Sequence, residues 1–338
     1  MNRAVWQRSR PALVLLFASA GLAFCAPAGP PPGTAGEIRI GYPSVADFQD
    51  LPSLMALDLL MEQGYSVVPT FFAQSELAVE ALATGETDVG FGNARAHWAA
   101  IQQGAELQTV MEQAANGWSV VSRLEITDCA GLDGQRLAVG SEGSVAKAMT
   151  DAWMAEVCPA AAPEILIIPG SDNRAAALLA GQIDATTAEP ADVVQLLAED
   201  SDRFHVLVDF ASRLPDLLTT GVHVNSEFAA AHPQAVRDLV KAVVEIHRRV
   251  AADPDLLITQ AIDRLGFDPG DVPAILETHR SIGTWDVDGG LSREAVEYSL
   301  GFYIRTGSLG PGLTGDQVAD LSYLEAVLEE LGRASSSP

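Results

Sequence analysis

Residues 81–90 read ALATGETDVG, and residues 177–186 read ALLAGQIDAT, which aligns with the first stretch without a gap. Alanine, leucine, glycine and aspartate recur in register, the last two as Gly85 with Gly181 and Asp88 with Asp184. In each copy an apolar helical stripe stops at the glycine, and a strand begins shortly afterwards. The repeat therefore predicts two lobes of similar architecture, although a shared helix-to-strand junction does not require a common origin.

Strands and helices alternate around both copies of this pattern. Such alternation predicts βαβ units, parallel sheets and an α/β fold. After a strand at 204–208, a strand at 221–224 is expected to return the chain to the first lobe, and the remaining chain reads as helical. The expected strands are 37–41, 66–72 and 87–91 in the first half and 137–140, 165–168 and 183–187 in the second. The first C-terminal helix has an apolar stripe at 228–250, and His232 and Pro233 mark its start; the others are expected at 256–265, 272–279, 293–306 and 323–331.

The N-terminal segment indicates export. Three arginines precede an apolar run at 12–24, which predicts a signal peptide within residues 1–25. A Pro/Gly/Ala tract at 26–36 follows and predicts a tether. Two alternatives stay open: lipid acylation of Cys25, with the protein anchored to a membrane, or ordinary cleavage near Ala20 or Ala28. Either one places the chain in the periplasm or at the cell surface.

Cysteine usage agrees with an oxidising compartment. Once Cys25 is removed or acylated, only Cys129 and Cys158 remain. An even number of cysteines in an exported protein predicts a disulfide between them, and two separate buried thiols are the alternative.

Charge excludes several classes of partner. The formal net charge is −25. Such an acidic chain is a poor partner for nucleic acid and for anionic lipid surfaces.

Signals of catalysis and of metal binding are absent from the sequence. The six histidines are scattered without metal-ligand spacing, and no zinc-protease, nucleophile-elbow or CxxC motif occurs. Asp286 and Asp288 resemble part of a calcium loop, but Gly290 falls one residue too early, which favours a plain turn. We therefore expect no enzyme activity, no cofactor and no metal.

Several segments together resemble the substrate-binding proteins of ABC importers for nitrate, sulfonates, taurine and thiamine precursors, a branch of the type II periplasmic binding proteins. The resemblance implies lobe 1 from 37–125 plus 219–338, lobe 2 from 126–218, a hinge of two crossing strands, and closure of a monomer on a ligand that is passed to a permease. The segments that carry it are 38–41 (IRIG), 81–90, 132–139 (LDGQRLAV), 177–185, Glu189-Pro190, and Trp285 followed by 289–292 (GGLS).

Candidate ligand contacts lie where the strands end, because ligands of open α/β sheets bind outside the carboxyl ends of the strands. For several candidates a purely structural role is the alternative to ligand binding. Tyr42 and Trp118 could belong to the core, residues 141–144 could be an ordinary helix cap, and Glu189 could simply end a strand. The candidates are Tyr42, Ser44, Asp47, Gln74, Asn93 and Trp118 in lobe 1 and at the hinge, and Ser141, Gly143, Ser144, Asn173 and Glu189 in lobe 2.

The charge of these loops bears on the class of ligand. Acidic side chains outnumber Arg95 and Arg174 in them. This favours a neutral or cationic heteroaromatic compound, such as a thiamine-precursor pyrimidine or a flavin, over a small inorganic anion. Sulfonates and carboxylates remain alternative ligands, because helix N-termini can bind anionic groups. The alternative functions are an enzyme of the same fold acting on a small aromatic or pyrimidine compound, and an extracellular sensor.

Overall fold

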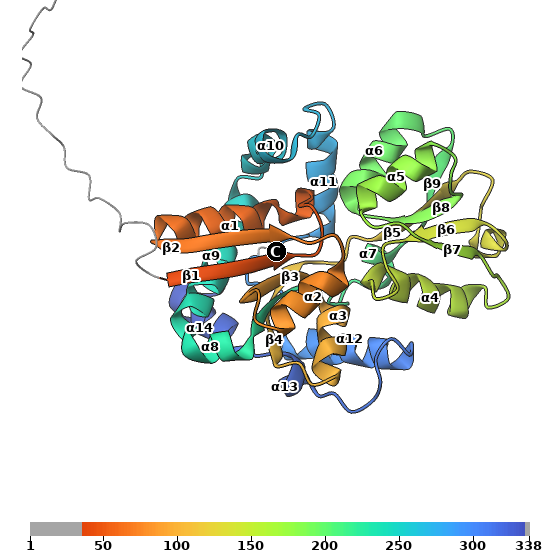
Figure 1. The fold of residues 1–338 in the computed structure, drawn as a ribbon. Helices are drawn as coiled ribbons and strands as arrows, with labels where there is room; N and C mark the ends of the chain where they lie inside the picture. The colour runs from red at the N-terminus through yellow and green to blue at the C-terminus, as the bar shows by residue number, and fades with distance from the viewer. Residues whose placement is uncertain (1–35, 335–338) are drawn as a thin grey trace, which may run out of the picture.

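The computed structural model describes residues 36–334, which form two lobes, each built around a five-stranded sheet (Figure 1). In the first sheet the strands lie in the order β2-β1-β3-β10-β4. β1 is parallel to β2 and β3, and β10 is antiparallel to β3 and β4. The bounds are β1 Gly36–Tyr42, β2 Tyr65–Phe71, β3 Val89–Asn93, β4 Leu107–Ala114 and β10 Thr220–Asn225.

The second sheet repeats this plan with the order β7-β6-β8-β5-β9. β6 is parallel to β7 and β8, and β5 is antiparallel to β8 and β9. The α/β fold with two like lobes, expected from the repeat, is confirmed. The bounds are β5 Ser119–Arg123, β6 Arg136–Val139, β7 Glu164–Ile167, β8 Ala185–Ala188 and β9 Phe204–Asp209.

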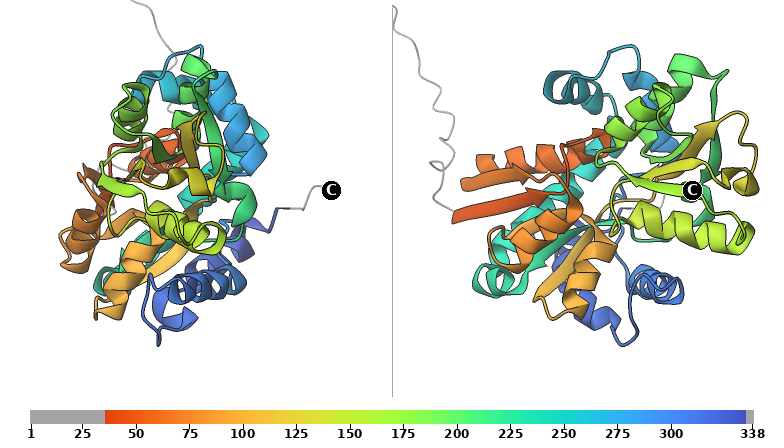
Figure 2. Two further views of the ribbon diagram at one scale, coloured as in Figure 1. Left: turned by 90° about the vertical axis from the view of Figure 1, so that its right-hand side faces the viewer. Right: turned by 45° about the vertical axis from the view of Figure 1, so that its right-hand side comes forward.

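The antiparallel strand of each sheet follows a crossing from the other lobe. β5 enters the second sheet directly after β4, and β10 returns to the first sheet after β9 (Figure 2). The crossings are therefore 115–118 and 214–219. The boundary between the lobes was expected at 125/126, after β5. Because β5 pairs with β8 and β9, it belongs to the second sheet, and the chain crosses between the lobes before β5.

The two aspartates of the sequence repeat make equivalent contacts. Asp88 Oδ2 accepts from the Arg39 backbone N–H at 2.8 Å and from its Nε at 3.0 Å. Asp184 Oδ2 accepts from the Arg136 backbone N–H at 3.0 Å and from its Nε at 2.8 Å. Hydrogen bonding to Arg136 lowers the pKa of Asp184 to about 2. Each aspartate thus ties the third parallel strand of its sheet to the first.

Helices cover both faces of the first sheet, and the C-terminal part of the chain supplies most of them (Figure 1). The long C-terminal helix begins at Pro233 with His232 as its cap, as expected, and the first residues of the apolar stripe 228–250 belong to a separate short helix because proline cannot continue it. The helices are η1 Phe48–Asp50, α1 Leu51–Glu62, α2 Ser75–Ala83, α3 Ala94–Gln102, α8 Ser226–Ala231, α9 Pro233–Ala252, α10 Leu256–Gln260, η3 Ala261–Leu265, α11 Val272–Ile282, α12 Arg293–Arg305, α13 Gly315–Val318 and α14 Ser322–Leu331.

The second lobe is smaller and carries fewer helices. They are η2 Cys129–Leu132, α4 Val145–Val157, α5 Ser171–Leu179, α6 Pro190–Asp200 and α7 Phe210–Arg213. None of the helices within 36–334 is apolar over enough length to cross a bilayer. The predicted signal peptide, Cys25 and the tether up to residue 35 lie outside the described residues, whereas Gly36 is the first residue of β1.

Cys129 and Cys158 form a disulfide, with their Cα atoms 5.8 Å apart. The bridge joins the start of η2 to the end of α4 and confirms the predicted pairing. Replacing both cysteines by serine is expected to lower the free energy of unfolding by about 3–4 kcal/mol, because the unfolded chain gains the entropy of an open loop. Urea denaturation with and without a reducing agent measures this loss. If the reducing agent leaves the urea midpoint of the parent protein unchanged, the disulfide does not contribute to the free energy of unfolding.

Candidate functional site

A cavity lies between the lobes, where the parallel strands of both sheets end. Its wall receives residues after β1, β2 and β3 from one lobe and after β6, β7 and β8 from the other. The crossing segment adds Trp118, which is half-buried. The six strand ends nominated from the sequence therefore meet in one place. The lining residues are Pro43, Ser44, Gln49, Asp50, Ala73, Gln74, Ser75, Gly92, Asn93, Gln113, Trp118, Gly140, Ser141, Ser144, Val145, Ala146, Pro169, Gly170, Ser171, Arg174, Glu189 and Thr220.

Seven of the eleven candidate contacts line this cavity, three lie beside it, and Tyr42 lies in the core of the first lobe. Asp47 and Asn173 line a groove that continues from the cavity and shares Glu189 with it. Gly143 lies at the rim, between lining residues Ser141 and Ser144. The candidates in the cavity wall are Ser44, Gln74, Asn93, Trp118, Ser141, Ser144 and Glu189.

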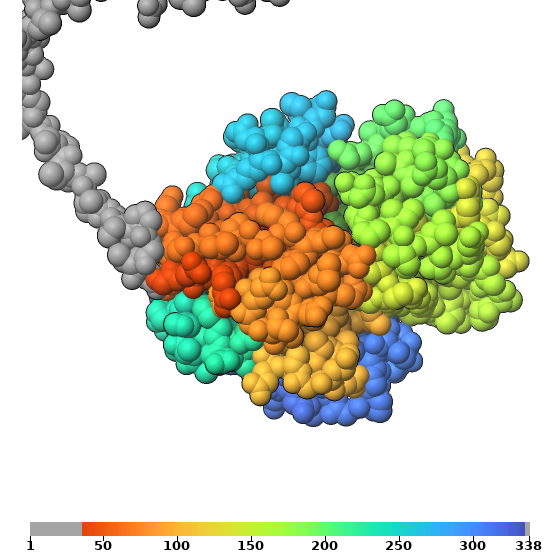
Figure 3. Space-filling view, in the orientation of Figure 1, coloured from red at the N-terminus to blue at the C-terminus, as the bar shows by residue number. Residues whose placement is uncertain are grey.

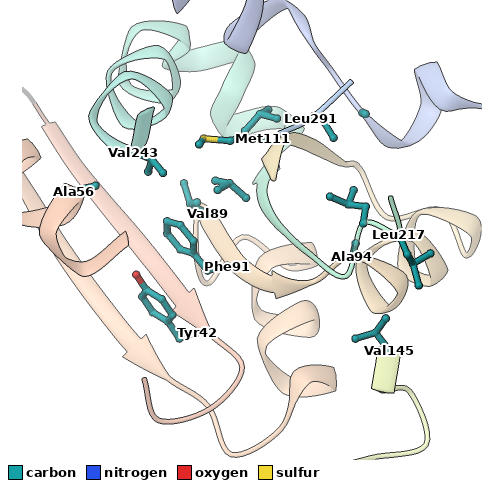
Figure 4. Packing of buried hydrophobic residues seen from close by; sticks show 14 of the residues in the cluster. Tyr42, Ala56, Val89, Phe91, Ala94, Met111, Val145, Leu217, Val243 and Leu291 are labelled. Atoms are coloured by element: carbon teal, nitrogen blue, oxygen red, sulfur yellow. The ribbon is translucent and has the colours of Figure 1, made fainter. Parts of the chain in front are cut away.

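Tyr42 does not face the cavity, which corrects its expected role in stacking a ligand. Its side chain is 1% exposed and stacks on Phe91, with ring centroids 5.0 Å apart, inside the apolar core of the first lobe (Figure 4). Its hydroxyl is hydrogen-bonded to Ser53 at 2.9 Å. The last residue of β1 points into the core because side chains alternate between the two faces of a strand.

The lobes touch across the mouth of the cavity. Glu76 of α2 accepts hydrogen bonds from the Ser141 hydroxyl at 2.7 Å and from the Gly143 N–H at 3.2 Å. Asn93 Nδ2 donates to the Gly143 carbonyl at 3.0 Å. The structure is therefore a closed form, in which the facing rims abut (Figure 3).

The loop 141–144 has two functions in this closed form. Ser144 caps α4 by accepting from the Lys147 N–H at 3.2 Å, which is the ordinary alternative considered for this loop. Ser141 and Gly143 bind Glu76 of the other lobe. A Cβ atom on Gly143 would lie 2.5 Å from Glu76 Oε1, so a larger residue at this position would displace the Glu76 carboxylate from its hydrogen bonds with Ser141 and Gly143.

Arg174 brings a buried positive charge to the cavity wall. Its side chain belongs to α5, is 2% exposed, and lies over the Trp118 ring, 5.9 Å from the ring centroid. Its Nε donates to the Thr187 carbonyl at 3.0 Å, and its Nη1 donates to the carbonyls of Ile168 at 3.1 Å and Gly170 at 2.9 Å. It forms no ion pair with any residue of 36–334. From the sequence, Arg174 was expected only as one of the charges of the loops. Its place one helical turn after Ser171 was the signal that both side chains lie on the side of α5 that lines the cavity.

Comparison with known proteins identifies the family. Residues 61–256, more than half of the chain, match the family model described as NMT1/THI5 like. The chain belongs to the NMT1/THI5-like family. No curated protein sequence matches it.

Solved structures share the fold of this NMT1/THI5-like protein. The alkanesulfonate-binding protein SsuA of Xanthomonas axonopodis pv. citri, bound to MOPS, is 18% identical with a TM-score of 0.67, over 86% of this chain and 99% of that one. The periplasmic nitrate-binding protein NrtA of Synechocystis PCC 6803 is 13% identical with a TM-score of 0.70, over 88% and 89%. A ligand-binding component of an ABC-type import system from Staphylococcus aureus, with zinc bound, is 13% identical with a TM-score of 0.70, over 86% and 98%. At these identities the likeness establishes the two-lobed periplasmic binding protein fold.

Carboxyl groups gather at one side of the cavity in this NMT1/THI5-like protein. Burial raises the pKa of Asp50 to about 7, although its Oδ1 accepts from Gln113 Nε2 at 2.6 Å. Burial also raises the pKa of Asp192 to about 7. The pKa of Glu189 is raised well above its usual range, first by burial and then by the neighbouring Asp47. Asp47 and Asp50 belong to lobe 1 and Glu189 and Asp192 to lobe 2, so closure brings like charges together.

Proposed function

We propose that this chain is the extracytoplasmic solute-binding component of an ABC importer, which holds a small organic ligand between its lobes and has no enzyme activity. The observation that carries the proposal is the cavity whose wall comes from both lobes while their rims touch. A ligand that contacts both lobes stabilises the closed state, and a permease can recognise that state. The fold shared with SsuA and NrtA, which bind alkanesulfonates and nitrate, supports this function.

The size of the cavity bears on the ligand. Its volume is about 120 Å³. An engineered cavity of about 150 Å³ in another protein holds benzene. A single-ring compound such as a pyrimidine, or a short-chain compound, therefore suits the closed form better than a fused-ring flavin. Trp118 offers an aromatic surface on which a ring can stack.

We infer export and membrane proximity from the N-terminal segment. Residues 1–25 act as the signal peptide in this proposal, and the segment that follows tethers lobe 1. The two alternatives, acylated Cys25 and cleavage near Ala20 or Ala28, give different intact masses for the mature chain. A mature mass that retains the apolar run 12–24 would contradict both of them.

A ligand screen by thermal denaturation tests the function. Single-ring pyrimidines, sulfonates, amines, aromatic acids and nitrate are added to the mature protein, and each mixture is then assayed for chemical conversion. A ligand at a hundred times its Kd is expected to add about 2.7 kcal/mol to the free energy of unfolding and to be recovered unchanged. Conversion of the compound to a product would instead support an enzyme of the same fold.

A further inference from the structure

One wall of the cavity presents a buried hydrogen-bond acceptor that no residue of 36–334 satisfies. Gln113 is 3% exposed and lines the cavity beside Asp50. Its Nε2 donates to Asp50 Oδ1, which fixes the orientation of the amide, and its Oε1 has no hydrogen-bond partner among the described residues. A buried acceptor without a partner is costly, so this wall favours a ligand that carries a hydrogen-bond donor.

A second unsatisfied acceptor lies in the groove that continues from the cavity. Asp192 is 6% exposed, and its Oδ2 has no partner within 36–334. Glu189 lines both the cavity and the groove, and Asp47 lines the groove with it. The acceptor wall, defined here as Asp50, Gln113, Glu189 and Asp192, thus runs from the interior of the cavity outwards.

Little positive charge balances this wall. Arg174 is the one basic side chain among the described residues that line the cavity and the groove, so a single positive charge faces the carboxyl groups of Asp50, Glu189 and Asp192. No group of histidine, cysteine or acidic residues within 36–334 is arranged to hold a metal ion. The missing partner of the acceptor wall is therefore an organic cation with N–H groups.

We propose that the ligand carries a protonated nitrogen, which donates to Gln113 Oε1 and is neutralised by Asp50 and Glu189, with Asp192 facing the same charge from the groove. This inference rests on the proposed binding function and specifies the ligand class. The remainder of the ligand lies against Trp118 and presents a hydrogen-bond acceptor towards Arg174. A charge-assisted hydrogen bond in a buried site makes the amine decisive for affinity.

The pH dependence follows from competition between the proton and the amine. The groups that face the nitrogen are Asp47 and Asp50 before α1, Asp172 and Arg174 on α5, Glu189 and Asp192 on α6, and Asp268 after η3. Burial raises the pKa values of Asp50 and Asp192 to about 7, so these groups are partly protonated at neutral pH. An amine must displace those protons, and its affinity should rise between about pH 6 and pH 8.

The experiment compares compounds that differ only at the nitrogen. The mature protein is first dialysed against a small-molecule extract of cells, and the retained compound is identified by mass spectrometry. Matched pairs are then titrated by calorimetry, among them benzylamine against benzyl alcohol and aminomethylpyridine against hydroxymethylpyridine. We expect the retained compound to contain a basic nitrogen, and amines to bind at least about tenfold more tightly than their alcohols.

Variants assign this preference to the acceptor wall. Glu189→Gln should reduce the preference for the amine to within about threefold of the alcohol. Glu199→Gln makes the same substitution at an exposed carboxylate of α6 that lines neither the cavity nor the groove, and it should keep the preference. A retained compound without a basic nitrogen, or an amine preference that Glu189→Gln leaves intact, overturns the inference but not the binding function. If no compound is retained and none shifts the melting temperature, both proposals fail.

Discussion

Arg174→Met is expected to lower the free energy of unfolding by about 3 kcal/mol or more and to weaken ligand binding at least about tenfold. The guanidinium supplies three hydrogen bonds to the carbonyls of Ile168, Gly170 and Thr187, which lie where β7 and β8 end. Without it the Ile168 carbonyl loses this donor, and the carbonyls of Gly170 and Thr187 keep only the Arg174 N–H and the Thr186 hydroxyl. A hydrogen bond from a charged group contributes about 1.5–3 kcal/mol, so the loss of all three accounts for the expected effect. Urea denaturation and calorimetry with the ligand found in the screen measure the two effects.

Two further variants separate charge from geometry. Arg174→Lys keeps the positive charge, but an ammonium group cannot reproduce the planar fork that reaches three carbonyls, so it should restore only part of the stability. Arg203→Met is the matched control, because Arg203 belongs to the same lobe and its side chain is 51% exposed. Equal stability of Arg174→Met and Arg203→Met would show that Arg174 does not support the cavity wall.

Gly143→Val is expected to weaken ligand binding by about tenfold, with little change in the melting temperature of the ligand-free protein. A side chain at Gly143 meets the Glu76 carboxylate, so closure requires either a displaced Glu76 or a wider gap between the lobes. A displaced Glu76 loses the hydrogen bonds that it accepts from Ser141 and the Gly143 N–H, and the loss of about 1.5–3 kcal/mol for a bond to a charged group falls on the closed state alone. Calorimetry measures the affinity, and small-angle scattering measures the closure.

A second substitution tests this explanation of the Gly143→Val effect. Glu76→Ala removes the side chain that the valine meets, so the double variant should bind more tightly than Gly143→Val alone. If the two substitutions weaken binding additively, Gly143 and Glu76 do not interact in the closed state, and the contact between the rims is not what limits closure.

The two-lobed fold was predictable because its signal is local and repeated. Gly85 and Gly181 stop a helix, and Asp88 and Asp184 directly precede the next strand, so the same short pattern specifies the same unit twice. The strand ends then nominate the cavity, since parallel strands place their carboxyl ends at one edge of a sheet. These inferences need only neighbours in sequence and the rules of sheet assembly.

The remaining features depend on contacts between distant segments. β4 and β5 were not assigned from the sequence, and the membership of β5 in the second sheet is decided by its pairing with β8 and β9. Tyr42 was placed in the site because it follows the expected strand 37–41, but β1 includes it, and its ring faces the core, where it stacks on Phe91. The contact of Glu76 with Gly143 joins the two lobes and leaves no pattern within either segment.

The central claim is that one ligand is held by both lobes at once, and a crystal structure with the ligand found in the screen tests it most directly. We predict density for the ligand inside the cavity, in contact with Trp118 and Gln113 on one side and with Arg174 and Glu189 on the other. A ligand that binds outside this cavity, or that touches a single lobe while the other stands open, would contradict the account.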